Sequence, residues 1–440
     1  MSSTWPSTGP LGGQPAVPAP PMYGSNGAAM IPAAPARTLS GDVLAGMPAA
    51  RAFGEIVDFA VNAGASDLFF LSEEAALRIA MRRMGRLETL LALSPETGRN
   101  VVNVMKADAG IDIGDRRRPH EGRYIQQVGD HGVDLRINIV PTVHGEDVAV
   151  RIHDSKSGLR TLDQIGFLRS ERSRIESILE NRSGLVLVTG ATATGKTTTL
   201  YACLQHLNNG TRKINTLEDP VEYVLPGLRQ SQVHAKIGLD FPELLRNILR
   251  QSPDVIMVGE IRDEETAATA VRAANSGTLV LSTLHAPIAA GAVQSMLALS
   301  VNRYFLSNCL LAVVAQRLVR TLCPDCRVPY DITESPETFA DVRPLLEQGQ
   351  GDYIFGHGAC AKCNYQGFNG RTAIVEFMTF NRRMRDLVAR GCSAEEIQQA
   401  AIENGMIEFK RAAMVKVAQG VTTTEEILRE LPAEQLGLEN

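Results

Sequence analysis

The middle of the chain alternates short apolar runs with longer segments of helical spacing. An apolar run at 185–188 precedes a helix-compatible segment at 196–207, and an Ala-rich segment at 264–275 also has helical character. Strands that alternate with helices form a mostly parallel sheet covered by helices, so this pattern predicts an α/β domain. The other runs that predict strands of this sheet lie at 213–217, 255–258 and 278–281.

The part of the chain before this domain has a different pattern. Residues 51–63 have helical spacing, and strand-like runs separated by turn glycines then predict an antiparallel sheet. We therefore expect a small α+β domain over residues 46–160 and a second domain over 161–440, which ends in helices from Met378 on. The predicted strands of the first domain are 68–71, 77–81, 123–126, 133–140 and 148–152, with turns at Gly85, Gly129 and Gly145.

Residues 1–45 are rich in Pro, Ala, Gly and Ser. Such a segment offers too little apolar surface to offset its ordering entropy, so its composition predicts a disordered tail. Trp5, the only tryptophan, leaves open a docking element, although a passive linker is the favoured interpretation.

The composition limits the kinds of partner that the chain is expected to bind. Of its 440 residues, 44 are basic and 49 acidic, and the net charge of −5 gives no general attraction to nucleic acid or to an anionic membrane. The longest apolar stretch, around 304–315, is interrupted by polar residues and too short to span a bilayer. With seven cysteines and no signal-like apolar segment, the sequence predicts a protein of a reducing cytoplasm.

A complete phosphate-binding motif follows the run at 185–188. Gly, four free positions, Gly-Lys and a hydroxyl residue stand between a predicted strand and a predicted helix, which makes a chance Gly-rich turn the weaker alternative. Lys196 is suited to the β- and γ-phosphates of ATP, and the Thr197 hydroxyl to Mg²⁺. The expected nucleotide-binding residues are Gly190, Ala191, Thr192, Ala193, Thr194, Gly195, Lys196, Thr197 and Thr198.

Polar clusters follow three other predicted strands, at 218–222, 259–263 and 282–285. Because the carboxyl ends of parallel strands meet at one edge of a sheet, these clusters are expected to converge on the phosphates. Glu260 is the natural residue to hold the metal or orient the attacking water, and Glu218 is the other candidate base. Asp219 and Glu222 are candidates to support the metal, with a solvated surface acid as the alternative for Glu222. His285 is a candidate sensor of the γ-phosphate, with a purely structural histidine as its alternative.

Two Cys-x-x-Cys pairs, Cys323/Cys326 and Cys360/Cys363, suit tetrahedral thiolate ligation of Zn²⁺. Four thiolates leave no open coordination position, so this zinc is expected to be structural. Redox-active pairs and free buried thiols are the weaker alternatives. Three further cysteines are interpreted as packing residues: Cys203, Cys309 and Cys392.

Together these motifs resemble those of the secretion ATPases of type II secretion and type IV pilus assembly, from about residue 65 to residue 428. The resemblance implies a P-loop, RecA-like ATPase domain preceded by a small sensory-like (PAS-like) domain. It also implies a cytoplasmic homo-hexameric ring, peripheral to the inner membrane, that moves an inner-membrane platform protein and so pilin subunits. The zinc knuckles are similar to those of the assembly and export branch. The stretches that carry the resemblance are GATATGKTTTLY, TLEDPVEY, LRQSPDVIMVGEIRD, TLVLSTLH and AQRLVRTLCPDC.

The resemblance also implies a role for two arginines. Arg136 and Arg151 lie in VDLRIN and VAVRIHD, which look like the family's strands whose arginines face the γ-phosphate. Without the resemblance, arginines on strands, including Arg123, favour a water-facing position. In family terms, 218–222 is the aspartate box, 254–263 the Walker B segment and 278–285 the histidine box.

The chain departs from the family pattern at a few positions. Ala193 replaces a usual Gly and is expected to fit the loop with a negative φ, and Thr278 replaces the first histidine of the histidine box. These departures bear on the turnover rate and keep open a low-turnover nucleotide-binding regulator. A nucleic-acid translocase of the same broad fold is the other alternative, disfavoured by the net charge of −5. The remaining departures are Ala191 for Pro and Ala286-Pro287 for Thr-Asn.

Overall fold

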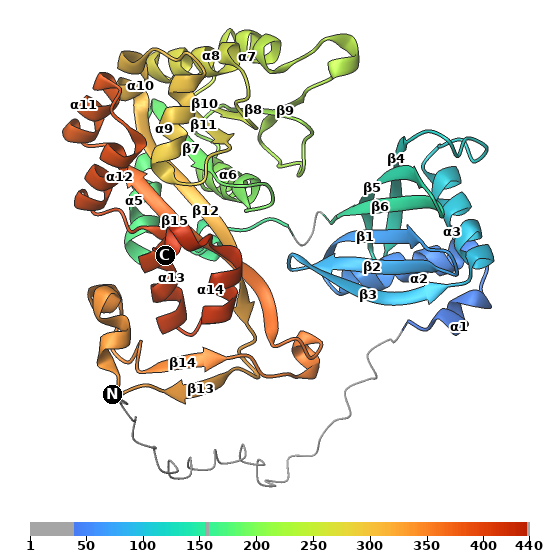
Figure 1. The fold of residues 1–440 in the computed structure, drawn as a ribbon. Coiled ribbons are helices and arrows are strands. Elements are labelled where there is room, and N and C mark those ends of the chain that lie inside the picture. The colour runs from blue at the N-terminus through green and yellow to red at the C-terminus, as the bar shows by residue number, and fades with distance from the viewer. Residues whose placement is uncertain (1–38, 155–157, 438–440) are drawn as a thin grey trace, which may run out of the picture.

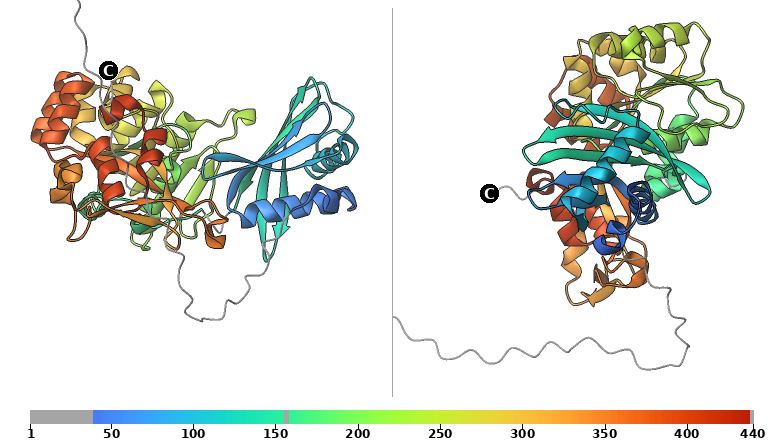
Figure 2. Two further views of the ribbon diagram at one scale, coloured as in Figure 1. Left: turned by 60° about the horizontal axis from the view of Figure 1, so that its bottom comes forward. Right: turned by 90° about the vertical axis from the view of Figure 1, so that its right-hand side faces the viewer.

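The computed structural model describes residues 39–154 and 158–437, which form two domains (Figure 1). In the first domain, the described strands make a six-stranded antiparallel sheet of order β3-β2-β1-β6-β5-β4. Helices α2 (Ala49–Asn62) and α3 (Pro95–Asp108) pack their apolar faces on this sheet (Figure 2). The strands are β1 (Ala65–Ser72), β2 (Leu77–Arg83), β3 (Arg86–Leu93), β4 (His120–Val128), β5 (His131–Thr142) and β6 (Gly145–His153).

The five strands and the helix expected in this domain are confirmed, but strand β3 and helices α1 (Gly41–Ala45) and α3 were not predicted. Only Leu93 of strand β3 is buried, so the apolar residues of this strand do not alternate clearly with polar ones. The expected disordered tail also extends too far, because Gly41–Ala45 forms helix α1 and buries Leu44. Residues 1–38 of that tail lie outside the described part of the chain.

The second domain has the predicted α/β architecture. Its described strands form a seven-stranded sheet of order β15-β12-β7-β11-β10-β8-β9, in which β15 alone runs antiparallel to its neighbour. Every residue of the interior strand β7 is buried, because helices cover both faces of the sheet. The strands are β7 (Gly184–Thr189), β8 (Ile214–Glu218), β9 (Arg229–Gln232), β10 (Val255–Val258), β11 (Leu279–Leu284), β12 (Leu310–Leu322) and β15 (Phe368–Thr379).

The helices divide between the two faces of this sheet. Helix α6 (Lys196–Leu207) and α5 (Arg169–Leu179) build one apolar core, while α7, α8, α9 and the C-terminal helices build the other. The predicted helices at 196–207 and 264–275 match α6 and α8 in both bounds. The remaining helices are α7 (Phe241–Leu249), α8 (Glu264–Asn275), α9 (Ala289–Ala298), α10 (Arg303–Cys309), α11 (Arg382–Arg390), α12 (Ala394–Glu403), α13 (Phe409–Ala418) and α14 (Thr424–Glu430), with short turns at α4 (Leu162–Ile165) and α15 (Ala433–Leu436).

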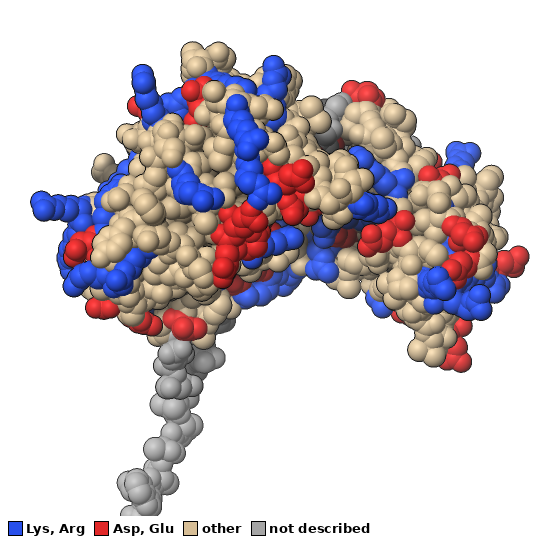
Figure 3. All heavy atoms as spheres, turned by 90° about the horizontal axis from the view of Figure 1, so that it is seen from above, with Lys and Arg blue, Asp and Glu red and all other residues tan. Residues whose placement is uncertain are grey.

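The helices and the surface of the protein bear on the question of a membrane or nucleic-acid partner. Within the described residues, no helix is both long and apolar enough to cross a membrane. On the face seen in Figure 3, basic and acidic side chains are interspersed over both domains.

A buried ion pair ties α14 to the sheet. Arg320 of β12 donates to Glu426 from Nε (3.0 Å) and Nη2 (2.7 Å), and the side chains are 7% and 1% exposed. The guanidinium also lies 3.8 Å from the centre of the Phe368 ring. Burial raises the pKa of Glu426, but the hydrogen bonds and charge of Arg320 outweigh it and hold that pKa below its ordinary value.

We predict that Glu426→Ala lowers the free energy of unfolding by about 3 kcal/mol or more, because it leaves Arg320 buried without its main partner. Since the pKa of Glu426 is depressed, this contribution is present at neutral pH and is lost as the pH falls through the folded-state pKa. Denaturant unfolding at neutral and acidic pH measures both effects. The control is Glu403→Ala, which breaks the exposed pair with Arg383 and should leave the midpoint nearly unchanged. Equal effects of the two variants would contradict the prediction.

Candidate functional site

The phosphate loop joins the end of β7 to the start of α6. A Cβ at Gly190 would lie 2.6 Å from the Gln316 carbonyl oxygen, and Gly190 and Gly195 both have positive φ (147° and 86°). The Gln316 side chain donates to the Thr194 carbonyl oxygen at 2.6 Å. The loop is therefore pressed against β12, and glycine is required at both positions.

The expectation for Ala193 is wrong, because its φ is +63°. This left-handed conformation costs a residue with a Cβ about 1–2 kcal/mol relative to the right-handed region. The loop adopts it because its glycines and its contacts with Gln316 fix the path of the backbone on both sides.

The polar clusters converge as predicted. A cavity of about 290 Å³ opens over the loop at the carboxyl ends of β8, β10 and β11. It is lined by residues of the phosphate loop and of all three clusters: Thr192, Ala193, Lys196, Thr197, Glu218, Asp219, Glu222, Glu260, Arg262 and His285.

Lys196 lies at the centre of this convergence. Its ammonium donates to the carbonyl oxygens of Gly190 (2.9 Å) and Ala191 (3.0 Å) and lies 3.4 Å from Nδ1 of His285. Burial lowers the pKa of Lys196, while the charge of Glu260 opposes that shift. Lys196 is thus the cation nearest the phosphate loop in a cavity that also holds Arg262 and several carboxylates.

Glu260 faces Lys196 from the end of β10. Its carboxylate lies 2.7 Å from Nη2 of Arg262 and 2.9 Å from Nε2 of His285, and its side chain is 17% exposed. Both partners are themselves accessible, at 63% and 49% exposure, so they do not close off the carboxylate from the cavity. Glu260 therefore contacts Arg262 and His285 and lies near the Lys196 ammonium.

Glu218 has a different environment. It is 3% exposed, and its two oxygens accept hydrogen bonds from the Tyr201 hydroxyl (2.5 Å), the Thr216 hydroxyl (2.6 Å) and Nε2 of Gln230 (3.1 Å). These three donors occupy both oxygens of the Glu218 carboxylate. Neither Tyr201 nor Gln230 was predicted as a partner of Glu218. The one available signal was the position of Tyr201 on the helix that follows the phosphate loop.

The first domain reaches this cavity through Arg136. Its Nη2 atom donates to Oε2 of Glu222 at 2.9 Å, and Glu222 lines the cavity. His153, at the end of β6, also contacts the Glu222 carboxylate, at 3.5 Å. Arg151 behaves differently, because its side chain is 70% exposed and lies 3.5 Å from Asp67.

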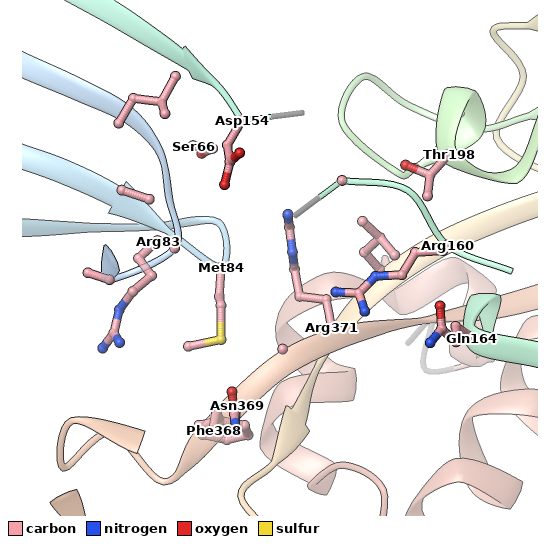
Figure 4. Close-up of a pocket in the computed structure, with 18 of the residues that line it drawn as sticks. Ser66, Arg83, Met84, Asp154, Arg160, Gln164, Thr198, Phe368, Asn369 and Arg371 are labelled. Atoms are coloured by element: carbon pink, nitrogen blue, oxygen red, sulfur yellow. The ribbon is translucent and has the colours of Figure 1, made fainter. Parts of the chain in front are cut away.

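A second pocket lies on the other side of the phosphate loop, between the domains. It has a volume of about 520 Å³, and its walls include Gly195, Thr198 and Thr199. Figure 4 shows Arg83 and Met84 of the first domain across this pocket from Thr198 and Arg160. The loop therefore separates a cavity rich in carboxylates from an interdomain pocket.

Thr278, which replaces the first histidine of the histidine box, lies far from the cavity. Thr278 immediately precedes β11, whereas His285 follows its last residue, and a strand of that length separates them by about 20 Å. Thr278 cannot contact phosphates bound by the loop. Ala286, by contrast, donates its N–H to the Thr189 hydroxyl at 2.7 Å and so ties the histidine segment to the end of β7.

The four predicted cysteines form one cluster between β12 and β15, beside the antiparallel pair of β13 (Val328–Asp331) and β14 (Tyr353–Gly356). Sulfur–sulfur distances are 3.8 Å for Cys323–Cys360, 3.8 Å for Cys326–Cys363 and 3.7 Å for Cys360–Cys363. Tetrahedral Zn–S bonds of about 2.3 Å put sulfur atoms about 3.8 Å apart. The Gly367 N–H also donates to the Cys363 sulfur at 3.1 Å, as expected for a thiolate. The donor set fits zinc.

Known proteins resemble this chain over most of its length. The family model for Type II/IV secretion system proteins matches residues 45–429. Type II secretion system protein E of Pseudomonas aeruginosa is 39% identical over 386 residues, which are 87% of this chain and 75% of that protein. Type II secretion system ATPase E of Vibrio cholerae is 37% identical over 385 residues, with the same two coverages. The ATPase DotB of Legionella pneumophila shares the fold, with a TM-score of 0.63 at 20% identity over 90% of this chain and 96% of its own. The chain therefore belongs to the Type II/IV secretion system protein family and is one of its P-loop ATPases.

Proposed function

We propose that this chain is a motor that hydrolyses ATP to drive pilin or pseudopilin assembly in a type II secretion or type IV pilus machine. The observation that carries the proposal is the convergence of Lys196, Glu260 and His285 on one cavity over the phosphate loop. In this proposal the triphosphate of ATP would lie along the loop, and its nucleoside would extend past Thr198 into the interdomain pocket, whose walls include Gly195 and Thr198.

Several residues of the cavity each have a task in hydrolysis. Lys196 and the loop N–H groups bind the β- and γ-phosphates, and Glu260 accepts a proton from the water that attacks the γ-phosphorus as ADP departs. The Thr197 hydroxyl, supported by Asp219, would hold Mg²⁺, whose charge offsets that of the phosphates. Glu218 fixes the acidic edge of the cavity, and His285 orients Glu260.

Arg136 and Arg151 extend the site from the first domain. Arg136 already contacts Glu222 of the cavity wall. Arg151 lies directly opposite Arg136 on the neighbouring strand, so a shift of the sheet toward the nucleotide carries both guanidinium groups together. Added positive charge at the γ-phosphoryl group favours the transition state over bound ATP.

The four cysteines hold a structural Zn²⁺ that ties β12 to β15, and the chain works as a homo-hexamer in the cytoplasm. It is held at the inner membrane by a platform protein of the secretion or pilus machine. This assembly rests on the family to which the chain belongs and on the relatives named Type II secretion system protein E.

We predict that Lys196→Ala lowers kcat/KM by about a hundredfold or more and weakens ATP binding, because it removes the cation of the phosphate site. Glu260→Gln should bind ATP within about threefold of wild type but lower kcat by about a hundredfold or more. Phosphate-release kinetics and binding of a fluorescent nucleotide measure these effects. Glu180→Gln, at the exposed end of α5, is the matched control. Wild-type turnover in either site variant would refute the assignment.

We predict about one zinc per chain, lost in Cys360→Ser, with faster proteolysis between residues 323 and 363, because a closed thiolate site contributes folding energy. Elemental analysis and limited proteolysis measure both. Cys392→Ser, at an isolated cysteine, should keep its zinc. Protein purified without chelator and free of zinc would count against this site.

We predict that Arg136→Ala and Arg151→Ala each lower kcat by about 10³-fold while ATP affinity changes little, because the arginines act on the transition state. The control is Arg123→Ala on β4, which pairs with Asp134 and should keep wild-type kcat. Unchanged kcat in both site variants would show that these arginines are ordinary strand residues.

A further inference from the structure

Two stacked tyrosines connect the first domain to the acidic edge of the cavity. Tyr201 of α6 is fully buried, and its ring meets that of Tyr223 edge to face, with centroids 5.3 Å apart at 84°. On the other side, the Tyr223 ring lies 4.8 Å from the ring of His153, the last residue of β6. A continuous row of rings therefore runs from the first domain into the core of the second.

At the end of this row that lies in the second domain, the Tyr201 hydroxyl makes polar contacts. The Tyr201 hydroxyl donates to Oε2 of Glu218 at 2.5 Å and accepts the Tyr223 N–H at 3.2 Å. Gln230 reinforces the same arrangement by donating to Oε1 of Glu218 (3.1 Å) and to the Tyr223 carbonyl oxygen (2.8 Å). The orientation of the Glu218 carboxylate thus depends on where Tyr223 lies.

The outer end of the row is fixed by the first domain and its connection. A Cβ at Gly158 would lie 1.7 Å from the Tyr223 hydroxyl, so a side chain at this position would displace the Tyr223 ring. The neighbouring Glu222 contacts Arg136 and His153. Movement of the first domain must displace Tyr223 or break these contacts.

We propose that Tyr201 is a positioning residue for Glu218, and that Tyr223 makes this positioning depend on the docking of the first domain. The proposal rests on the function proposed above, in which Glu218 is part of the hydrolytic cavity. Tyr201 does not line that cavity, so it acts through Glu218. Hydrolysis is favoured when the first domain is seated, because Glu218 then has its full set of donors.

The test is a double-mutant cycle on ATP turnover by the full chain. Tyr201→Phe keeps the buried ring and removes one donor to a carboxylate, so kcat should fall about tenfold while the Kd for ATP changes less than about threefold. Tyr223→Leu removes the stacked ring and should lower kcat to a similar extent, whereas Tyr223→Phe keeps the ring and should restore most of the loss. The double variant Tyr201→Phe/Tyr223→Leu should be no slower than the slower single variant.

Several results would overturn this assignment. Wild-type kcat in Tyr201→Phe shows that the hydroxyl does not position Glu218, and a change confined to Kd shows a binding role instead. Fold-changes that multiply in the double variant show that the two tyrosines act independently. A wild-type chain without any ATP turnover would overturn the proposed function and this assignment with it, whereas an active wild type with an equally active Tyr201→Phe overturns the assignment alone.

Discussion

The parallel alignment of β8, β10, β11 and β7 is the constraint on which the site depends. Each of these strands is buried along its whole length, because helices cover both faces of the sheet. A shift of one strand relative to its neighbours would misplace a row of apolar side chains against those helices. The ends of the strands are therefore held in register, and the polar residues that follow them meet over the phosphate loop.

This convergence brings several carboxylates close together, and each of them has different hydrogen-bond and ion-pair partners. Glu218 is buried under three hydrogen-bond donors, Glu260 lies between Arg262 and His285, and Glu222 turns toward Arg136 of the other domain. The three carboxylates thus differ in how available they are to water and metal. The contact made by Glu222 also means that the cavity is bounded partly by the first domain.

Most helices and strands of the second domain could be predicted from the sequence, because the patterns that indicate them are local. The phosphate-loop motif and the apolar periodicity predicted the first and last residues of α6 and α8 correctly. The two cysteine pairs predicted a four-cysteine cluster, which the fold brings together. Strand β3 was missed because an exposed edge strand has no clear alternation of apolar residues. The backbone of Ala193 was also misjudged, since its positive φ is imposed by contacts with distant parts of the chain. The partners of Glu218 could not be predicted, because the packing of α6 and β9 against β8 brings Tyr201 and Gln230 to it.

The central claim is that one nucleotide engages both domains, and hydrogen–deuterium exchange with a slowly hydrolysed ATP analogue tests it most directly. We expect added protection in three places: the phosphate loop at 190–198, the segment 218–223, and the end of β6 at 148–153 in the first domain. Protection confined to the phosphate loop, with the first domain unchanged, would contradict the claim.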